Sequence, residues 1–243
     1  MKTLLFDYGG TLDTAARHWN YVLLDGYRHI AATLEPALRV VEGTIWREAY
    51  VHGERALAKT PIILPTDDFR TLLLKKVRIE LQYLLDNGTL SLSDERLEVI
   101  ASAIADHCDA AARTHIEESR KVLTTLQDRG YRFVLVTNFY GNIHAVLRAY
   151  ALDHFFPAIV ESAVVGVRKP DPAIWTLGVE AAQTTTDQCI AIGDSYGKDI
   201  LAARAAGCDT IWFKGEEWEE KQYDETLPTH VITSLSQILE LLP

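Results

Sequence analysis

Short apolar runs that end in polar residues are the feature that most limits how this chain can fold. Five such runs recur along the sequence, at residues 3–7 (TLLFD), 132–138 (RFVLVTN), 158–162 (AIVES), 189–195 (CIAIGDS) and 209–215 (DTIWFKG). Their length and apolar character are typical of strands buried inside a sheet. Amphipathic segments lie between several of them. Because strands that alternate with helices form parallel sheets with right-handed crossovers, we predict an α/β core with a doubly wound, Rossmann-like parallel sheet.

Residues 15–115 do not follow this alternation, and we find no convincing strand among them. Their apolar residues recur instead at the spacing of amphipathic helices. Gly88 stands where one such helix would stop, and Ser93 stands where the next would begin. The pattern predicts an all-helical cap subdomain at 15–115, inserted after the first strand, and a core formed by residues 1–14 and 116–243.

The overall charge and the cysteines narrow the class of protein. Asp and Glu together number 34 and Lys and Arg 24, which gives a formal net charge of −10. An acidic balance argues against a nucleic-acid partner or an anionic membrane surface. No apolar run is long enough to span a bilayer, and Cys108, Cys189 and Cys208 show no metal-binding or disulfide spacing. We therefore expect a cytoplasmic protein with reduced cysteines, a monomer or dimer, that binds neither nucleic acid nor membrane.

Polar side chains suited to chemistry stand at or near the ends of the predicted strands. They are Asp7, Thr137, Asn138, Lys169, Asp194 and Asp199. In an open parallel sheet, ligands bind at the carboxyl ends of the strands. These residues are therefore expected to converge on one cleft.

This set of residues makes physical sense for phosphoryl transfer. An aspartate such as Asp7 can attack phosphorus and form an acyl phosphate, which divides one difficult step into two easier ones. Two carboxylates beside a phosphate would repel it, and Mg²⁺, which prefers oxygen ligands, can be held by Asp7 and Asp194. Thr137 and Asn138 offer hydrogen-bond donors to phosphate oxygens. Lys169 adds positive charge where the transition state spreads negative charge.

At this point the chain resembles the haloacid dehalogenase superfamily, whose members are mostly phosphatases. FDYGGTLD resembles the first motif of the family, with Asp7 in the nucleophile position, and VTN with Thr137 resembles the second. VRKPDP with Lys169 resembles the third motif, and GDSYGKD with Asp194 and Asp199 resembles the fourth. The motifs cover the core in the order of the family, and the helical insert matches members whose cap follows the first strand.

The resemblance implies a role for each matching residue. As Mg²⁺ ligands it implies the Asp7 carboxylate, the backbone carbonyl of Gly9 and Asp194. For binding the phosphoryl group it implies Gly10, Thr137, Asn138 and Lys169. Asp199 would support Lys169 or the water molecules on the metal, so the implied catalytic residues are Asp7, Lys169 and Asp199.

One departure from the family pattern concerns proton transfer. Phosphatases of the family carry a second aspartate two residues after the nucleophile, where this chain has Gly9. That aspartate protonates the leaving alkoxide and later activates water, and such general acid–base help contributes about 10²–10⁴-fold. Gly9 can still offer its carbonyl to a metal, but it cannot transfer a proton.

We predict a phosphoric monoester hydrolase that uses Mg²⁺ and an aspartyl-phosphate intermediate on a small phosphorylated metabolite. A substitute acid could come from the cap, from solvent or from the substrate, and a substrate with a good leaving group would need none. His18 is the first substitute to test, because the unperturbed pKa of histidine suits proton transfer near neutral pH. The sequence does not identify the substrate.

Three alternatives remain open. The chain could bind a phosphorylated ligand or a protein partner without catalysis. It could be a dehalogenase, although such enzymes need no metal and lack the acid of the fourth motif, so Asp194 counts against this hypothesis. It could be a phosphonate hydrolase, which would need a cap lysine that forms a Schiff base. The cap lysines considered are Lys59, Lys75 and Lys76, and none lies in a motif that we identify.

Overall fold

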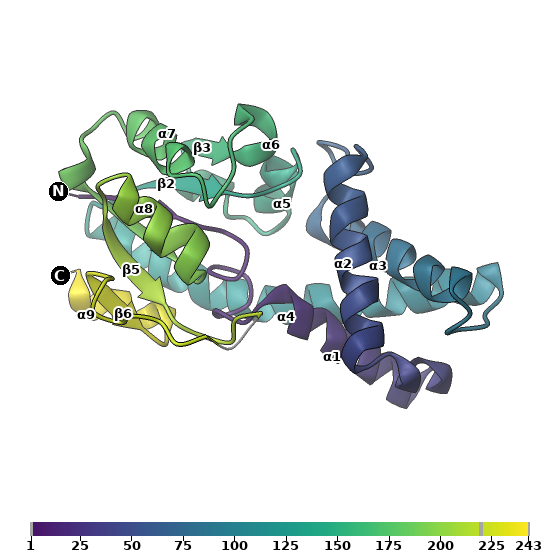
Figure 1. The fold of residues 1–243 in the computed structure, drawn as a ribbon. Coiled ribbons are helices and arrows are strands. Elements are labelled where there is room, and N and C mark those ends of the chain that lie inside the picture. The colour runs from purple at the N-terminus through teal and green to yellow at the C-terminus, as the bar shows by residue number, and fades with distance from the viewer. Residues whose placement is uncertain (1, 219–220, 243) are drawn as a thin grey trace. The chain divides into compact units, whose positions relative to one another are not determined.

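The computed structural model describes residues 2–218 and 221–242. Contacts within the chain divide it into two compact units, one formed by Met1–Trp19 with Arg113–Pro243 and the other by Asn20–Ala112. The first unit holds the sheet (Figure 1) and the second is built from helices. The 35-residue helix α4 (Asp94–Asp128) contributes residues to both units. The structure thus divides the chain at Trp19 and Ala112, whereas the sequence pattern suggests boundaries at residues 14 and 115.

The core unit contains one parallel sheet, with six strands among the described residues, in the order β3-β2-β1-β4-β5-β6. The strands are β1 (Thr3–Phe6), β2 (Arg132–Thr137), β3 (Ala158–Glu161), β4 (Cys189–Gly193), β5 (Asp209–Phe213) and β6 (His230–Ile232). All neighbouring strands pair in parallel. This order, in which the chain leaves β1 in both directions, is that of a doubly wound sheet. The predicted α/β fold class is therefore confirmed.

Apolar side chains pack on both faces of this sheet, because successive residues of a strand point to opposite faces. Leu5, Val134 and Val136 belong to a cluster with Trp175 of α7 (Ala173–Ala181). On alternate residues, the rings of Phe6 and Phe133 meet edge to face with centroids 5.6 Å apart. Helices α7 and α8 (Ala202–Ala205) cover one face in Figure 1 and the later part of α4 lies behind the other. Burial on both sides explains why the strand sequences are so apolar.

The remaining elements of the core unit are short. They are α5 (Ile143–Ala149), α6 (Ser162–Val165), α9 (Ile238–Leu241), the π-helical segment η4 (Tyr196–Leu201) and the 3-10 helices η2 (Asp153–Phe155), η3 (Thr186–Gln188) and η5 (Leu235–Gln237). Ser195 caps η4, and its hydroxyl accepts a hydrogen bond from the Lys198 N–H at 3.5 Å. This segment stands directly after β4, where it fixes residues of the GDSYGKD motif.

The helical unit consists of α1 (Trp19–Thr33), η1 (Pro36–Val40), α2 (Gly43–Lys59), α3 (Phe69–Asp86) and the first part of α4. No strand of the sheet lies within residues 15–115, all of which the structure describes. The Asp68 carboxylate accepts a hydrogen bond from the Thr71 N–H at 2.8 Å and so caps α3. Ser93 accepts one from the Arg96 N–H at 3.2 Å at the start of α4, as its sequence position suggests.

A group of ionisable side chains lies inside the helical unit. Glu80 of α3 is fully buried, and the Tyr27 hydroxyl donates to its Oε2 at 3.1 Å. The Lys76 Nζ is 4.0 Å from the other oxygen, Oε1, which has no hydrogen-bond partner. Burial raises the pKa of Glu80 to about 8, although Lys76 acts in the opposite direction. Much of the Glu80 population therefore carries a proton at neutral pH.

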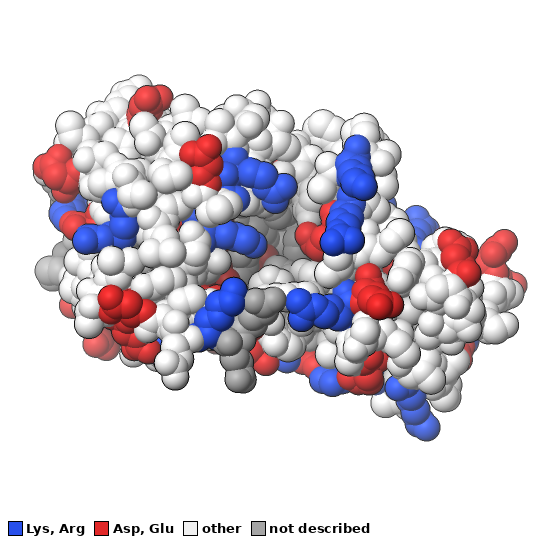
Figure 2. All heavy atoms as spheres, in the orientation of Figure 1, with Lys and Arg blue, Asp and Glu red and all other residues white. Residues whose placement is uncertain are grey.

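The charges on the surface are mixed. On the face shown in Figure 2, Lys and Arg side chains are interspersed with Asp and Glu side chains. The negative charge of the chain is thus not gathered into one region of this face, and the electrostatics of a site depend on its own neighbours. Cys108, Cys189 and Cys208 are buried free thiols. In the part of the chain that the structure describes, every helix is too short or too polar to cross a membrane.

Candidate active site

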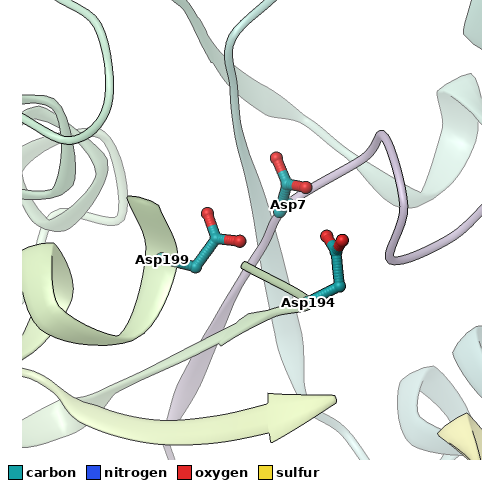
Figure 3. Close-up of side chains that lie close together, drawn as sticks. All are labelled: Asp7, Asp194 and Asp199. Carbon is teal, nitrogen blue, oxygen red and sulfur yellow. The ribbon is translucent and has the colours of Figure 1, made fainter. Parts of the chain in front are cut away.

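Three aspartates meet at the carboxyl edge of the sheet, where the strand order reverses. Asp7 follows β1, Asp194 follows β4 and Asp199 lies in η4. Their carboxylates point toward one another in Figure 3, and one oxygen from each lies within 4.8 Å of the others. Strands β1 and β4 are hydrogen-bonded neighbours, so the backbone itself brings Asp7 and Asp194 together. The structure thus assembles the strand-end residues that the sequence suggests would converge.

Lys169 joins two of these carboxylates. Its Nζ donates to Asp7 Oδ1 at 2.6 Å and to Asp199 Oδ1 at 2.7 Å, and its side chain is 2% exposed. The ammonium also lies 4.6 Å from the ring centroid of Trp175, where a cation–π contact is favourable. Burial alone would lower the pKa of Lys169, but the Asp199 and Asp7 carboxylates raise it, and the net pKa lies above the ordinary value. The lysine is therefore a fixed positive charge beside Asp7.

Asp199 has a donor on each oxygen. Lys169 occupies Oδ1, and the Ser195 N–H donates to Oδ2 at 2.9 Å. The side chain lies against Gly193, where an added Cβ would come within 2.4 Å of it. Because both oxygens are engaged, Asp199 is better suited to holding Lys169 in place than to binding another cation.

Asp194 is held by Thr11. The Thr11 hydroxyl donates to Asp194 Oδ1 at 3.1 Å and accepts from the Asp194 N–H at 3.0 Å. Trp212 Nε1 donates to the Asp194 carbonyl at 2.9 Å. Burial raises the pKa of Asp194 well above its ordinary value, and the carboxylates of Asp199 and Asp7 raise it further. Ionised Asp194 is thus a carboxylate short of positive charge.

The balance of charge in this cluster fits a divalent cation. Burial raises the pKa of Asp7 to about 6, against the effect of Lys169 and with that of Asp199. Three carboxylates face one ammonium, which leaves negative charge in a buried place. The three carboxylates offer oxygen atoms as metal ligands, and Mg²⁺ prefers oxygen ligands. Asp199 accepts from an ammonium and a backbone N–H, whereas the neutral Thr11 hydroxyl is the donor to Asp194 and to the second oxygen of Asp7, so Asp7 and Asp194 are the carboxylates best placed to bind the ion.

The turn after Asp7 is organised by Asp13, a residue that the sequence reasoning missed. Asp13 is fully buried, and it accepts hydrogen bonds from the Gly10 N–H at 2.7 Å and from Trp19 Nε1 at 3.0 Å. Burial is the main reason why its pKa rises to about 7. The fixed place of Asp13 at the end of FDYGGTLD was the available signal. Its carboxyl holds the turn that carries Gly9 and Gly10.

Gly10 serves this turn through its conformation and its backbone. Its φ is +94°, in the left-handed region that favours glycine, and an added Cβ would lie 2.3 Å from Asp194 Oδ2. Its N–H already donates to Asp13, and its carbonyl accepts from the Ala16 N–H at 2.7 Å. The turn thus uses the backbone N–H of Gly10, and the contact of Gly10 with phosphate stays a prediction.

Thr137 ends β2 and Asn138 follows it, at the same edge of the sheet. Thr137 is 1% exposed, at the last position of the strand. The Asn138 amide bonds the backbone of Lys169 twice, donating to its carbonyl at 3.0 Å and accepting from its N–H at 2.9 Å. In the structure the Asn138 amide thus positions Lys169, and the contact of Asn138 with phosphate stays a prediction. A loop that brings a buried lysine to the site must satisfy its own backbone groups, and Asn138 does so.

Gly9 occupies the position of the usual proton donor, and His18 is the substitute donor that the sequence suggests. An added Cβ on Gly9 would meet no heavy atom within 4 Å, so the position is open. The His18 ring packs against Trp218 with centroids 5.3 Å apart, and its backbone N–H donates to the Glu216 carbonyl at 2.8 Å. These contacts fix His18 to the segment after β5. Whether it moves a proton at Asp7 stays a prediction.

Comparisons with known proteins identify relatives of this chain. A stretch of 152 residues, 59% of this chain and 61% of the relative, is 33% identical to glyceraldehyde 3-phosphate phosphatase of Pyrococcus furiosus. The chain thus covers less than two thirds of that relative. A haloacid dehalogenase-like hydrolase domain-containing protein 3 of Bos taurus is 30% identical over 128 residues, about half of each chain.

The fold is shared with solved structures. A dehalogenase with an intermediate complex matches 100% of this chain and 97% of its own, with a TM-score of 0.63 and 18% identity. A further comparison, with the family of haloacid dehalogenase-like hydrolases, matches residues 1–207. The predicted resemblance is confirmed, and this chain belongs to the haloacid dehalogenase-like hydrolase family.

Proposed function

We propose that this protein is a Mg²⁺-dependent phosphatase that hydrolyses a small phosphorylated metabolite through an aspartyl-phosphate on Asp7. The observation that carries the proposal is the cluster of Asp7, Asp194 and Asp199 within 4.8 Å, with Lys169 between two of them. The phosphatase name of the Pyrococcus furiosus relative supports it. The helical unit would act as the cap that selects the substrate, as the resemblance implies.

The residues of the core unit divide the chemistry among them. The ionised Asp7 carboxylate attacks phosphorus, and Lys169 offsets negative charge on the phosphoryl oxygens. The hydroxyl of Thr137 supplies a further donor at the same edge. Asp199 and Asn138 hold Lys169 through its ammonium and its backbone. Mg²⁺ bound by Asp7, Asp194 and the Gly9 carbonyl would neutralise charge on the nucleophile and the phosphate.

A dehalogenase is the main alternative reaction, since structures of dehalogenases share the fold. The charge at Asp194 favours the phosphatase. An ionised carboxylate buried beside Asp7 and Asp199 is costly unless a cation compensates it. An enzyme that attacks a neutral carbon beside a halide has no use for that cation, whereas one that attacks a phosphate dianion does.

The test is turnover of a panel of phosphate esters, including 4-nitrophenyl phosphate, with Mg²⁺ and with EDTA. We expect turnover that requires Mg²⁺ and that is lost in Asp7→Asn, a variant whose folded state is checked by circular dichroism. Asp153→Asn, on an exposed residue of η2, is the matched control and should keep full activity. Failure to turn over any member would favour a phospho-ligand-binding protein. Halide release without metal would instead identify a dehalogenase.

A further inference from the structure

We propose that the substrates are phosphates whose leaving group departs as a stable anion, namely acyl, enol or aryl phosphates, and not phosphates of simple alcohols. This inference rests on the proposed function. It deepens that function by naming the substrate class, and it follows from where protons can and cannot be supplied around Asp7.

The need for a proton depends on the leaving group. When Asp7 Oδ forms a bond to phosphorus, the bond from phosphorus to the leaving oxygen breaks, and that oxygen keeps the electron pair. A carboxylate or a phenolate can leave in this form because each is a weak base. Carboxylic acids and phenols, as protein side chains, have pKa values of about 4 and about 10. An alkoxide is far more basic and needs a general acid, whose absence typically lowers the rate by about 10²–10⁴-fold.

The turn that carries Asp7 offers no side chain for this task. Tyr8 is fully buried, with its ring edge-on to Phe139 at a centroid distance of 5.7 Å. Gly9 and Gly10 have no side chain. The Thr11 hydroxyl lies between the carboxylates of Asp194 at 3.1 Å and Asp7 at 3.4 Å. Its proton is directed at the carboxylates of the site itself.

The neighbouring ionisable groups are also engaged. Both oxygens of Asp13 accept N–H donors, from Gly10 and from Trp19. Both oxygens of Asp199 do so too, from Lys169 and from the backbone of Ser195. Because each of these oxygens already accepts from an N–H group of the protein, neither carboxyl is placed to donate a proton to a leaving group on Asp7. Among the described residues of the core unit that contact Asp7 or its turn, each carboxyl thus has a structural task.

Position 9 has space around its Cα, and Gly9 itself carries no proton donor in a side chain. No heavy atom lies within 4 Å of an added Cβ on Gly9. A Cβ can therefore be added at position 9 without displacing the described surroundings. The vacancy makes the inference testable, because a carboxyl can be restored beside the nucleophile and compared with an amide of the same size.

The same shortage affects the second half of the reaction. Water attacks phosphorus of the aspartyl-phosphate, the bond to Asp7 Oδ breaks, and one water proton passes to solvent. With no carboxylate at position 9 to accept that proton, this step becomes slow. Asp7 should then stay phosphorylated for much of each cycle, and the leaving group should appear in an initial burst equal to the enzyme concentration.

The experiment measures kcat/KM with Mg²⁺ for acetyl phosphate, 4-nitrophenyl phosphate, phenyl phosphate and glycerol phosphate. We expect the rate to fall steeply as the leaving group becomes more basic, with glycerol phosphate about 10²-fold or more below phenyl phosphate. Rapid quenching followed by intact-mass measurement should show phosphorylated wild-type protein. Gly9→Asp should raise glycerol phosphate turnover by about 10²-fold or more and abolish the burst, while Gly9→Asn should do neither.

Three results would contradict the inference. Similar kcat/KM for glycerol phosphate and phenyl phosphate in the wild-type protein would overturn the inference and leave the phosphatase standing. Equal effects of Gly9→Asp and Gly9→Asn would also overturn it, because proton transfer would then not be the missing element. No turnover of any donor, acetyl phosphate included, would overturn the proposed function and this inference with it.

Discussion

Replacing Lys169 with methionine tests whether charge holds the candidate active site together. The Lys169 side chain is 2% exposed, and the Asp7 and Asp199 side chains that it bonds are 9% and 2% exposed. Removing one member of a buried ion pair costs about 3–5 kcal/mol, because a buried charge is left uncompensated. Methionine keeps an unbranched apolar side chain of similar length but removes the ammonium and its cation–π contact with Trp175. We expect Lys169→Met to lower the free energy of unfolding by about 3–5 kcal/mol at pH 8.

The cost should depend on pH with a definite sign. The pKa of Asp7, which burial already raises to about 6 in the folded protein, rises further when the ammonium is removed. The folded state then binds protons more tightly than the unfolded state, so stability falls as pH rises from the unfolded pKa through the folded pKa. The variant should therefore recover part of its stability at pH 5. Urea unfolding of metal-free protein at pH 5 and pH 8 measures this difference.

Lys198→Met is the matched control, since Lys198 is exposed on the same π-helical segment as Asp199. Its loss should change the unfolding free energy by no more than about 0.5 kcal/mol. Equal destabilisation of the Lys169 variant at both pH values would refute the reasoning. So would a cost below about 1 kcal/mol at pH 8, because desolvation of the lysine would then cancel its attraction to the carboxylates.

Two further substitutions test the turn at the site and the buried acid of the helical unit. Gly10 has a φ of +94°, and an added Cβ would lie 2.3 Å from Asp194. Gly10→Ala should therefore lower the free energy of unfolding by at least about 1–2 kcal/mol and weaken Mg²⁺ binding measured by calorimetry. Gly197→Ala, the control, should change neither quantity. The raised pKa of Glu80, about 8 against 4.5, means that wild-type stability falls as pH rises between these values. Glu80→Gln removes this loss, and Glu48→Gln, on an exposed residue, is the control. The unfolding free energy of Glu80→Gln should exceed that of the control by a margin that grows from pH 5.5 to pH 8. A margin that stays constant with pH would contradict the raised pKa of Glu80.

The sheet could be predicted because each central strand is buried on both faces. Leu4 and Leu5 of β1 are both fully buried, so the sequence of the strand carries no polar alternation that could be mistaken for a surface strand. Strand β6 escaped prediction for the opposite reason. It has three residues, pairs with β5 alone and has an exposed His230, so its sequence does not differ from that of a loop.

The residues of the candidate site could be predicted, but their hydrogen bonds could not. Parallel strands place their carboxyl ends at one edge, which is enough to bring Asp7 and Asp194 together from sequence position alone. The bonds of Asn138 to the backbone of Lys169, and of Asp13 to Gly10, depend on how two loops close against each other. Spacing along the chain holds no information about such closure, so a residue that shapes a turn resembles one that binds a ligand.

The hydrogen bonds of the cluster separate the tasks of its three carboxylates. Lys169 offsets charge on Asp7 and Asp199, and the Ser195 N–H takes the remaining oxygen of Asp199. Negative charge without a protein counter-ion is then concentrated at Asp194 and at the second oxygen of Asp7, which is where a cation is needed. In the proposed phosphatase, these residues would balance the charge of phosphoryl transfer. Gly9 cannot transfer a proton, so in the proposed phosphatase the basicity of the leaving group should limit the rate more than the binding of phosphate does.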